Sequence, residues 1–81
     1  MTNDEAEFNR KTELLLQRKI TELSSDLLGV VEINDRDQII KYHANDLNSE
    51  ISKISKRHTL PESHNEYIST IVTRLMVFGQ V

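Results

Sequence analysis

Apolar residues recur at alternating steps of four and three along the middle of the chain. The residues in this repeat are Ile40, Ala44, Leu47, Ile51, Ile54 and His58. Steps of four and three keep side chains on one face of an α-helix, and the narrow face that results is typical of a helical hairpin or a coiled coil. The repeat predicts a helix over about residues 35–58. Its N-cap is predicted to be Asn34, because a polar, turn-forming run begins there.

A repeat of the same kind precedes this one and predicts a helix over about residues 4–28. Its members are Leu16, Ile20, Leu23, Leu27 and Val30. Leu14, Leu15 and Leu28 fall outside the repeat and widen the apolar face beyond what one partner helix would cover. Residues 30–33 are rich in β-branched side chains, so this segment is predicted to be either a short strand or an extended connector.

The third apolar segment follows Pro61, which stops the preceding helix. Ser63 and Glu66 have the spacing of a capping box. Apolar residues at helical spacing follow, namely Ile68, Ile71, Val72, Leu75 and Met76. Residues 67–78 are rich in β-branched side chains, so a strand is the alternative. The capping box, and the lack of a second convincing strand to pair with, favour a helix over about residues 63–78.

These segments predict one all-α domain over residues 1–81. We expect an antiparallel two-helix hairpin, coiled-coil-like in its packing, with a shorter third helix. Two glycines and one proline in 81 residues favour long helices. A chain of this size buries only about 60% of the surface that its unfolded form exposes. With four aromatic residues and no cysteine, its core is predicted to be modest and to need a partner.

Composition and apolar runs restrict where the protein is expected to work. The longest unbroken apolar run is residues 75–78, far short of the ~20 residues that span a membrane. Residues 1–10 are polar and acidic and lack the apolar stretch of a secretory signal. We expect no membrane span and a cytoplasmic or nuclear protein that is not secreted.

No residue pattern typical of catalysis or cofactor binding is present in the sequence. There is no cysteine and no glycine-rich phosphate loop. His43 with Asp46, and His58 with His64, each offer two metal ligands, whereas zinc needs three or four. We therefore expect no enzyme activity, no catalytic residues, no cofactor and no metal.

One basic cluster is the candidate for nucleic-acid binding. Lys53, Lys56 and Arg57 lie at the end of the second predicted helix, where cations complement the helix dipole. A DNA-binding face usually carries more cations, and the whole chain has a net charge of −3. Nucleic acid is not the expected partner. The alternative function is a small helical regulator, including a homodimer, that binds DNA or a transcription protein.

The apolar repeats themselves are the best candidates for a functional site. They either form a private core among the three helices or face other chains. We expect the second, because the repeats are long and residues 75–78 are apolar on every side of a helix. The predicted partner interface comprises Leu16, Ile20, Leu23, Leu27, Ile40, Leu47, Ile51, Ile54, Leu75 and Phe78.

The function predicted from these features is a small, non-enzymatic subunit of a multiprotein complex. It would act as a scaffold element in protein–protein interaction, within a hetero-oligomer by preference and a homo-oligomer as the alternative. In general character the chain resembles the very small coiled-coil subunits of eukaryotic multiprotein complexes, such as kinetochore, Mediator or organelle-biogenesis assemblies. No motif selects one family, so no functional residue is carried over from that resemblance.

Overall fold

Three helices make up the fold. The computed structural model describes residues 3–56 and 64–80, with the side chains of residues 5–56 and 65–80. The helices are α1 (Asn3–Leu27), α2 (Ile33–Ser55) and α3 (His64–Gln80). No strand occurs among the described residues, so the predicted all-α class is confirmed.

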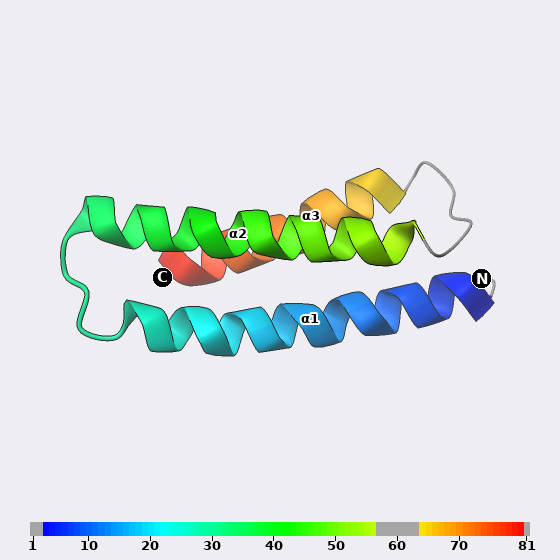
Figure 1. Ribbon diagram of the computed structural model, residues 1–81, viewed down its shortest axis with the longest axis horizontal. Helices are drawn as coiled ribbons and strands as arrows, with labels where there is room; N and C mark the ends of the chain where they lie inside the picture. The colour runs from blue at the N-terminus through cyan, green and yellow to red at the C-terminus, as the bar shows by residue number, and fades with distance from the viewer. Residues whose placement is uncertain (1–2, 57–63, 81) are drawn as a thin grey trace.

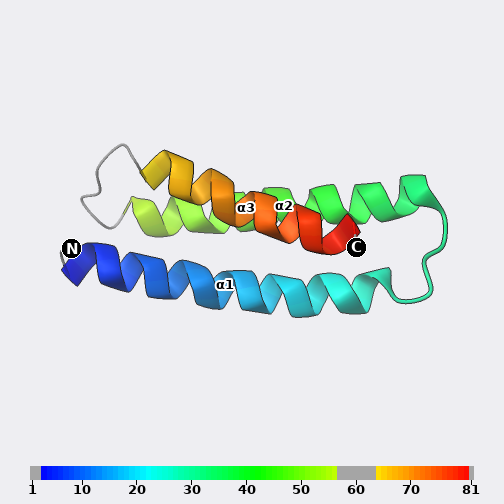
Figure 2. The same cartoon turned by 180° about the vertical axis from the view of Figure 1, so that it is seen from behind.

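Neighbouring helices in the sequence run in opposite directions along the long axis of the molecule (Figures 1 and 2). Each helix contacts both of the others, and the resulting bundle measures 44 × 19 × 18 Å. The shortest helix, α3, stops before the end at which α1 and α2 are connected (Figures 1 and 2). That end of the bundle is therefore built by two helices and their connector, with only the tip of α3 beside them.

The connection between α1 and α2 begins at a glycine. Gly29 has a φ of +81°, a left-handed conformation that other residues rarely adopt. The backbone N–H of Val30 donates to the Leu27 carbonyl at 3.1 Å, which closes the last turn of α1. Residues 30–32 then form an irregular connector without a strand.

The start of α2 differs from the prediction. Asn34 is not the N-cap, because α2 begins at Ile33 and Glu32 is the capping residue, with φ −75° and ψ 133° and no side-chain capping bond. The backbone N–H of Arg36 donates to the Glu32 carbonyl at 3.0 Å, which is the first helical bond of α2. The Arg36 guanidinium donates to the Val30 carbonyl at 2.8 Å. This side-chain contact stabilises the connector just before α2, where the capping residue itself makes no side-chain bond.

The third segment is helical throughout its described length. The strand alternative for residues 67–78 is wrong, since they lie within α3. The helix also extends two residues past the predicted end at residue 78 and includes Gly79. Ser63 of the predicted capping box, and His58 at the predicted end of the second helix, lie outside the described residues.

Gly79, near the end of α3, lies close to side chains of both other helices. A Cβ atom at this position would lie 2.8 Å from Ile40 Cγ1 and 3.1 Å from Leu23 Cδ2. Ordinary carbon–carbon contacts are about 3.5–4.0 Å. A side chain at this position would force Ile40, Leu23 or the end of α3 to move, and glycine avoids that contact.

The core lies along the axis where the three helices meet. Its largest fully buried side chains are Phe8, Leu16, Leu23, Leu47, Ile51, Ile71 and Leu75. One buried polar residue, Thr12, shares a 3.1 Å hydrogen bond with the Tyr67 hydroxyl of α3 and donates to the Asn9 carbonyl at 2.9 Å. The Phe8 and Tyr67 rings lie beside this bond, with centroids 6.2 Å apart. In the part of the chain that the structure describes, no helix has the length and hydrophobicity that crossing a membrane requires.

Candidate interaction surface

Most of the predicted interface residues are buried inside the chain's own bundle. The seven buried ones are Leu16, Leu23, Leu27, Ile40, Leu47, Ile51 and Leu75. In this fold their side chains hold the three helices together, and a partner could reach them only if the bundle opened. Ile20 and Ile54 are partly buried and pack against the core, while Phe78 is 41% exposed.

Exposed apolar side chains gather instead at the connector end of the bundle. Seven large apolar residues are exposed among the described residues, and five of them form what we call the end patch: Leu28, Val31, Ile33, Val77 and Phe78. Leu28 and Val31 are 84% and 86% exposed, and Ile33 is 74% exposed. Exposed apolar groups scattered singly are ordinary, whereas a contiguous group marks an interaction site.

Three adjoining hollows make the end patch continuous. A groove of about 460 Å³ is lined by Leu28, Val31 and Phe78, together with Arg36 and Gly79. A smaller hollow of about 260 Å³ also contains Arg36 and Gly79 and adds Ile33 to the lining. Phe78 belongs both to the first groove and to a third one, between α1 and α3. The patch therefore extends from the connector onto the side of the bundle.

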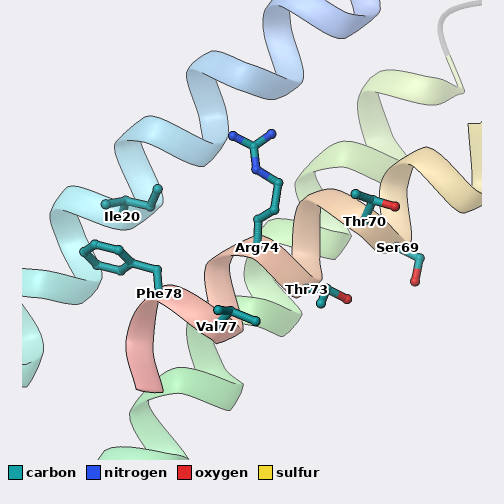
Figure 3. Close-up of a pocket in the computed structure, with 7 residues that line it drawn as sticks. All are labelled: Ile20, Ser69, Thr70, Thr73, Arg74, Val77 and Phe78. Carbon is teal, nitrogen blue, oxygen red and sulfur yellow. The ribbon is translucent and has the colours of Figure 1, made fainter. Parts of the chain in front are cut away.

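The groove between α1 and α3 has a volume of about 540 Å³. Its lining consists of Ile20, Ser69, Thr70, Thr73, Arg74, Val77 and Phe78 (Figure 3). Figure 3 shows the side chains of Ile20 and Phe78 beside each other, where α1 and α3 converge. Arg74 is the one charged residue in this lining, and its guanidinium donates to Glu13 at 2.7 Å. The groove thus offers apolar surface and hydroxyl groups, and its single cation already has a partner.

The connector that carries most of the end patch is held in place by Arg36. Its guanidinium reaches the Val30 carbonyl of the connector at 2.8 Å and the Leu27 carbonyl at the end of α1 at 3.4 Å. A cation at the end of a helix also complements the helix dipole. These bonds fix the backbone between Leu28 and Ile33, so the exposed side chains are presented from an ordered segment.

Negative charge lies beside the end patch on its connector and α2 side. Glu32, Asp35 and Asp37 are exposed residues of the connector and the first turns of α2, and we call them the acidic rim. Asp37 lines the same hollow as Ile33, and Glu32 stands between Val31 and Ile33 in the chain. Arg36, the one cation in this stretch, is already bonded to carbonyls.

A separate group of ionisable side chains joins α1 to α2. Lys19 is buried and donates to Asp46 and, at 3.2 Å, to Glu22. His43 is also buried, and its Nε2 lies 2.7 Å from Asp26 Oδ2. His43 and Asp46, which the sequence offered as a metal-binding pair, thus contact different α1 side chains. Among the residues that can be described, no cluster of three or more His, Cys, Asp or Glu could hold a metal.

Burial and pairing act in opposite directions on this group. Burial by itself would lower the pKa of Lys19, but hydrogen bonds to the Asp46 and Glu22 carboxylates outweigh it, so the pKa is raised above its ordinary value. The hydrogen bond from Lys19 in turn holds the pKa of Asp46 below its ordinary value, against a smaller opposing effect of desolvation. Both groups are charged at neutral pH and join the two helices, which is a structural role.

Comparison of the chain with protein-family models, curated proteins and solved structures finds no match in any of the three.

The residues that stand out on the surface were not those that periodicity selects. Val31 and Ile33 belong to neither apolar repeat and were predicted only as part of the β-branched segment 30–33. Leu28 was noted as a leucine outside the first repeat. A signal was nevertheless present. Three large apolar residues around a glycine, where the chain must turn, are exposed unless another element covers them, and the third helix is predicted to be shorter than the other two.

Proposed function

We propose that this protein is a non-enzymatic interaction subunit that docks through the end patch into a larger protein assembly. One observation carries the proposal: five of the seven exposed large apolar side chains in the described residues lie together at one end of the bundle. Leaving such a surface in water is unfavourable, at roughly 25 cal/mol per Å² of apolar area. Docking against a partner removes that cost.

The proposal keeps the predicted role and changes the residues that perform it. Ile20 and Phe78, two of the predicted interface residues, line the groove that continues the end patch. The seven buried members contribute by fixing the helices that carry it. The coiled-coil-like hairpin remains part of the proposal as the way in which α1 and α2 present their connector.

The alternative function, a helical regulator that binds DNA, has weaker support. Lys53 and Lys56 are exposed near the end of α2, and two cations make a small phosphate-binding face. Arg57, which completes the predicted cluster, lies outside the described residues. The end patch is bordered by carboxylates, which repel phosphate groups.

The experiment compares substitutions inside and outside the end patch. Val31→Gln with Ile33→Gln removes apolar surface without adding charge, and Leu14→Gln does the same at an exposed leucine of α1 that lines none of the three hollows. Each tagged variant is used for quantitative affinity purification, with circular dichroism to verify folding. Fully burying a Val or Ile side chain contributes about 1.5–3 kcal/mol. The double variant should therefore weaken partner binding a hundredfold or more.

The two possible results are clearly separated. A constant set of partners that is lost with the double variant and retained with Leu14→Gln supports an interaction subunit that uses the end patch. Partners that bind all variants equally, or a protein with no constant partner, contradict the proposal.

A further inference from the structure

We infer that the end patch and the α1–α3 groove form one docking surface for a basic, amphipathic helical segment of another protein. This inference rests on the proposed function and adds to it the chemistry of the partner. The partner's apolar side chains would fill the connector groove and pack against Phe78. Its lysines or arginines would lie over the acidic rim.

The negative charge at this end of the molecule favours a partner segment with positive charge. Residues 26–40 contain four carboxylates and one guanidinium, and the guanidinium of Arg36 is bonded to two carbonyls. The three carboxylates of the acidic rim are exposed. Glu32 lies between Val31 and Ile33 in the chain, Asp37 lines the same hollow as Ile33, and Asp35 lies in the first turn of α2 between them. Complementary charge around an apolar centre is how interfaces gain specificity and association rate.

A second copy of this chain fits the same surface poorly. Two copies joined end to end would place one acidic rim against the other, and like charges across an interface are unfavourable. The area is also small. The bundle is 19 × 18 Å across, so its end face is small beside the roughly 800 Å² that a stable interface buries on each partner. A contact restricted to the end face does not reach that area.

A helical segment can gain the missing area by continuing along the side of the bundle. The α1–α3 groove begins at Phe78 and Val77, which belong to the end patch, and extends along Ile20, Thr70, Thr73 and Arg74 (Figure 3). Its hydroxyl groups and apolar side chains suit the side of an amphipathic helix. Arg74, the one cation in the lining, is paired with Glu13, so its charge is already balanced when a basic partner approaches.

The test uses two matched synthetic helical peptides as probes. One has leucines along one face and lysines on the other, and its control has glutamate in place of every lysine. Each is titrated into the ¹⁵N-labelled full chain, with binding followed by amide chemical shifts at 50 and 300 mM salt. We expect the lysine peptide to shift the resonances of residues 28–33 and 77–79. Its affinity should fall with salt, and the glutamate peptide should bind at least tenfold more weakly.

A charge-neutral variant tests the acidic rim directly. Glu32→Gln, Asp35→Asn and Asp37→Asn are combined, and Glu7→Gln with Glu66→Gln serves as a control that removes exposed charge elsewhere. Each exposed ion pair multiplies affinity by roughly 1.4- to 5-fold. Neutralising the rim should therefore weaken binding of the lysine peptide about tenfold, while the control variant binds as the native chain does. Circular dichroism establishes that both variants are folded.

The outcomes separate this inference from the proposed function. If both peptides bind the end patch equally and without salt dependence, the charge selection is wrong while an apolar interaction surface remains. If the rim variant binds as tightly as the native chain, the inference is also wrong. Binding of the lysine peptide away from the end patch overturns it as well. So does sedimentation that shows the chain occupying its own patch by self-association.

Discussion

Substituting Gly79 with alanine tests whether α3 approaches α1 and α2 as closely as the structure shows. Helix propensity alone predicts that Gly79→Ala stabilises the protein, by up to about 1 kcal/mol in a helix interior and by less in the last turn. The structure predicts the opposite. The new Cβ would lie 2.8 Å from Ile40 Cγ1, 3.0 Å from its Cδ1 and 3.1 Å from Leu23 Cδ2.

The size of the effect follows from these distances. Carbon atoms in contact are normally about 3.5–4.0 Å apart, so α3 or its neighbours must move by roughly half an ångström or more. Overpacking of this kind costs about 1–3 kcal/mol. After the helix-propensity gain is subtracted, Gly79→Ala should lower the free energy of unfolding by about 1–2 kcal/mol. For a domain of this size, that lowers Tm by roughly 4–15 °C.

A double-mutant cycle identifies the contact responsible. Ile40→Ala alone should cost about 2–5 kcal/mol, because it leaves a cavity beside Gly79. In the double variant the Cβ of residue 79 occupies part of that cavity. The combined cost should therefore be smaller than the sum of the single costs by at least 1 kcal/mol. Urea unfolding followed by circular dichroism at 222 nm measures all four proteins.

Gly29→Ala serves as the control, since it is expected to destabilise for a different reason. A Cβ at this position meets nothing within 4 Å, but its φ of +81° strains a residue with a side chain. Its cost should be independent of Ile40. A Gly79→Ala protein that is more stable than the native chain, with costs that add in the double variant, would refute the close approach of α3.

Three other variants test the core, the charge pair and the connector. Leu47→Ala should lower the free energy of unfolding in urea by about 2–5 kcal/mol. Leu14→Ala, at an exposed site, should change it by no more than about 0.5 kcal/mol. Equal effects of the two substitutions would contradict the assigned core. The folded pKa of Asp46 is lowered from 3.8, so its stabilising contribution is present above that pH and is lost as pH falls through the folded pKa. The folded pKa of Lys19 is raised from 10.5. The stabilising contribution of Lys19 is therefore complete below pH 10.5 and is lost as pH rises through the folded pKa. When Tm is measured from pH 2 to 11, Asp46→Asn should reduce both the fall of Tm at acid pH and the fall of Tm at alkaline pH. An unchanged dependence of Tm on pH would show that the Lys19–Asp46 pair does not stabilise the fold. Arg36→Met should cost about 1 kcal/mol and accelerate amide exchange at residues 28–30, and unchanged exchange would mean that the guanidinium does not hold the connector.

Periodicity predicted the interior of α2 well because that helix has one narrow apolar face. Ile40, Ala44, Leu47 and Ile51 all lie on the predicted repeat, and all are buried. The number and order of the helices followed from the same spacing and from the scarcity of glycine and proline. A pattern of this kind requires only that apolar side chains leave water, whichever partner covers them.

The interior of α1 was harder to predict because two of its buried residues are polar. Thr12 is buried because its hydroxyl meets Tyr67 of α3, and Lys19 because its ammonium meets Asp46 of α2. Burying a polar group is tolerated only when a partner satisfies it. These partners are 55 and 27 residues away in the chain, so no local pattern reveals them.

The location of the candidate site followed from a difference in helix length more than from any motif. The two predicted repeats were interpreted as adhesive surfaces, but in a three-helix bundle each repeat is covered by the other two helices. What remains exposed is the part that the shortest helix does not reach. Leu28, Val31 and Ile33 lie at that part, and they are held there by Gly29 and by the bonds of Arg36 to the connector and the end of α1.

The same geometry connects the stability of the fold to its proposed role. Gly79 lets the end of α3 approach Ile40 and Leu23, and the residue before it, Phe78, thereby lies between the connector groove and the α1–α3 groove. A side chain at residue 79 would push this end of α3 outward and separate the two grooves. Gly79→Ala should therefore weaken binding of the lysine peptide even under conditions in which the variant remains fully folded. Binding that is unchanged in a destabilised Gly79→Ala protein would show that the two grooves act independently.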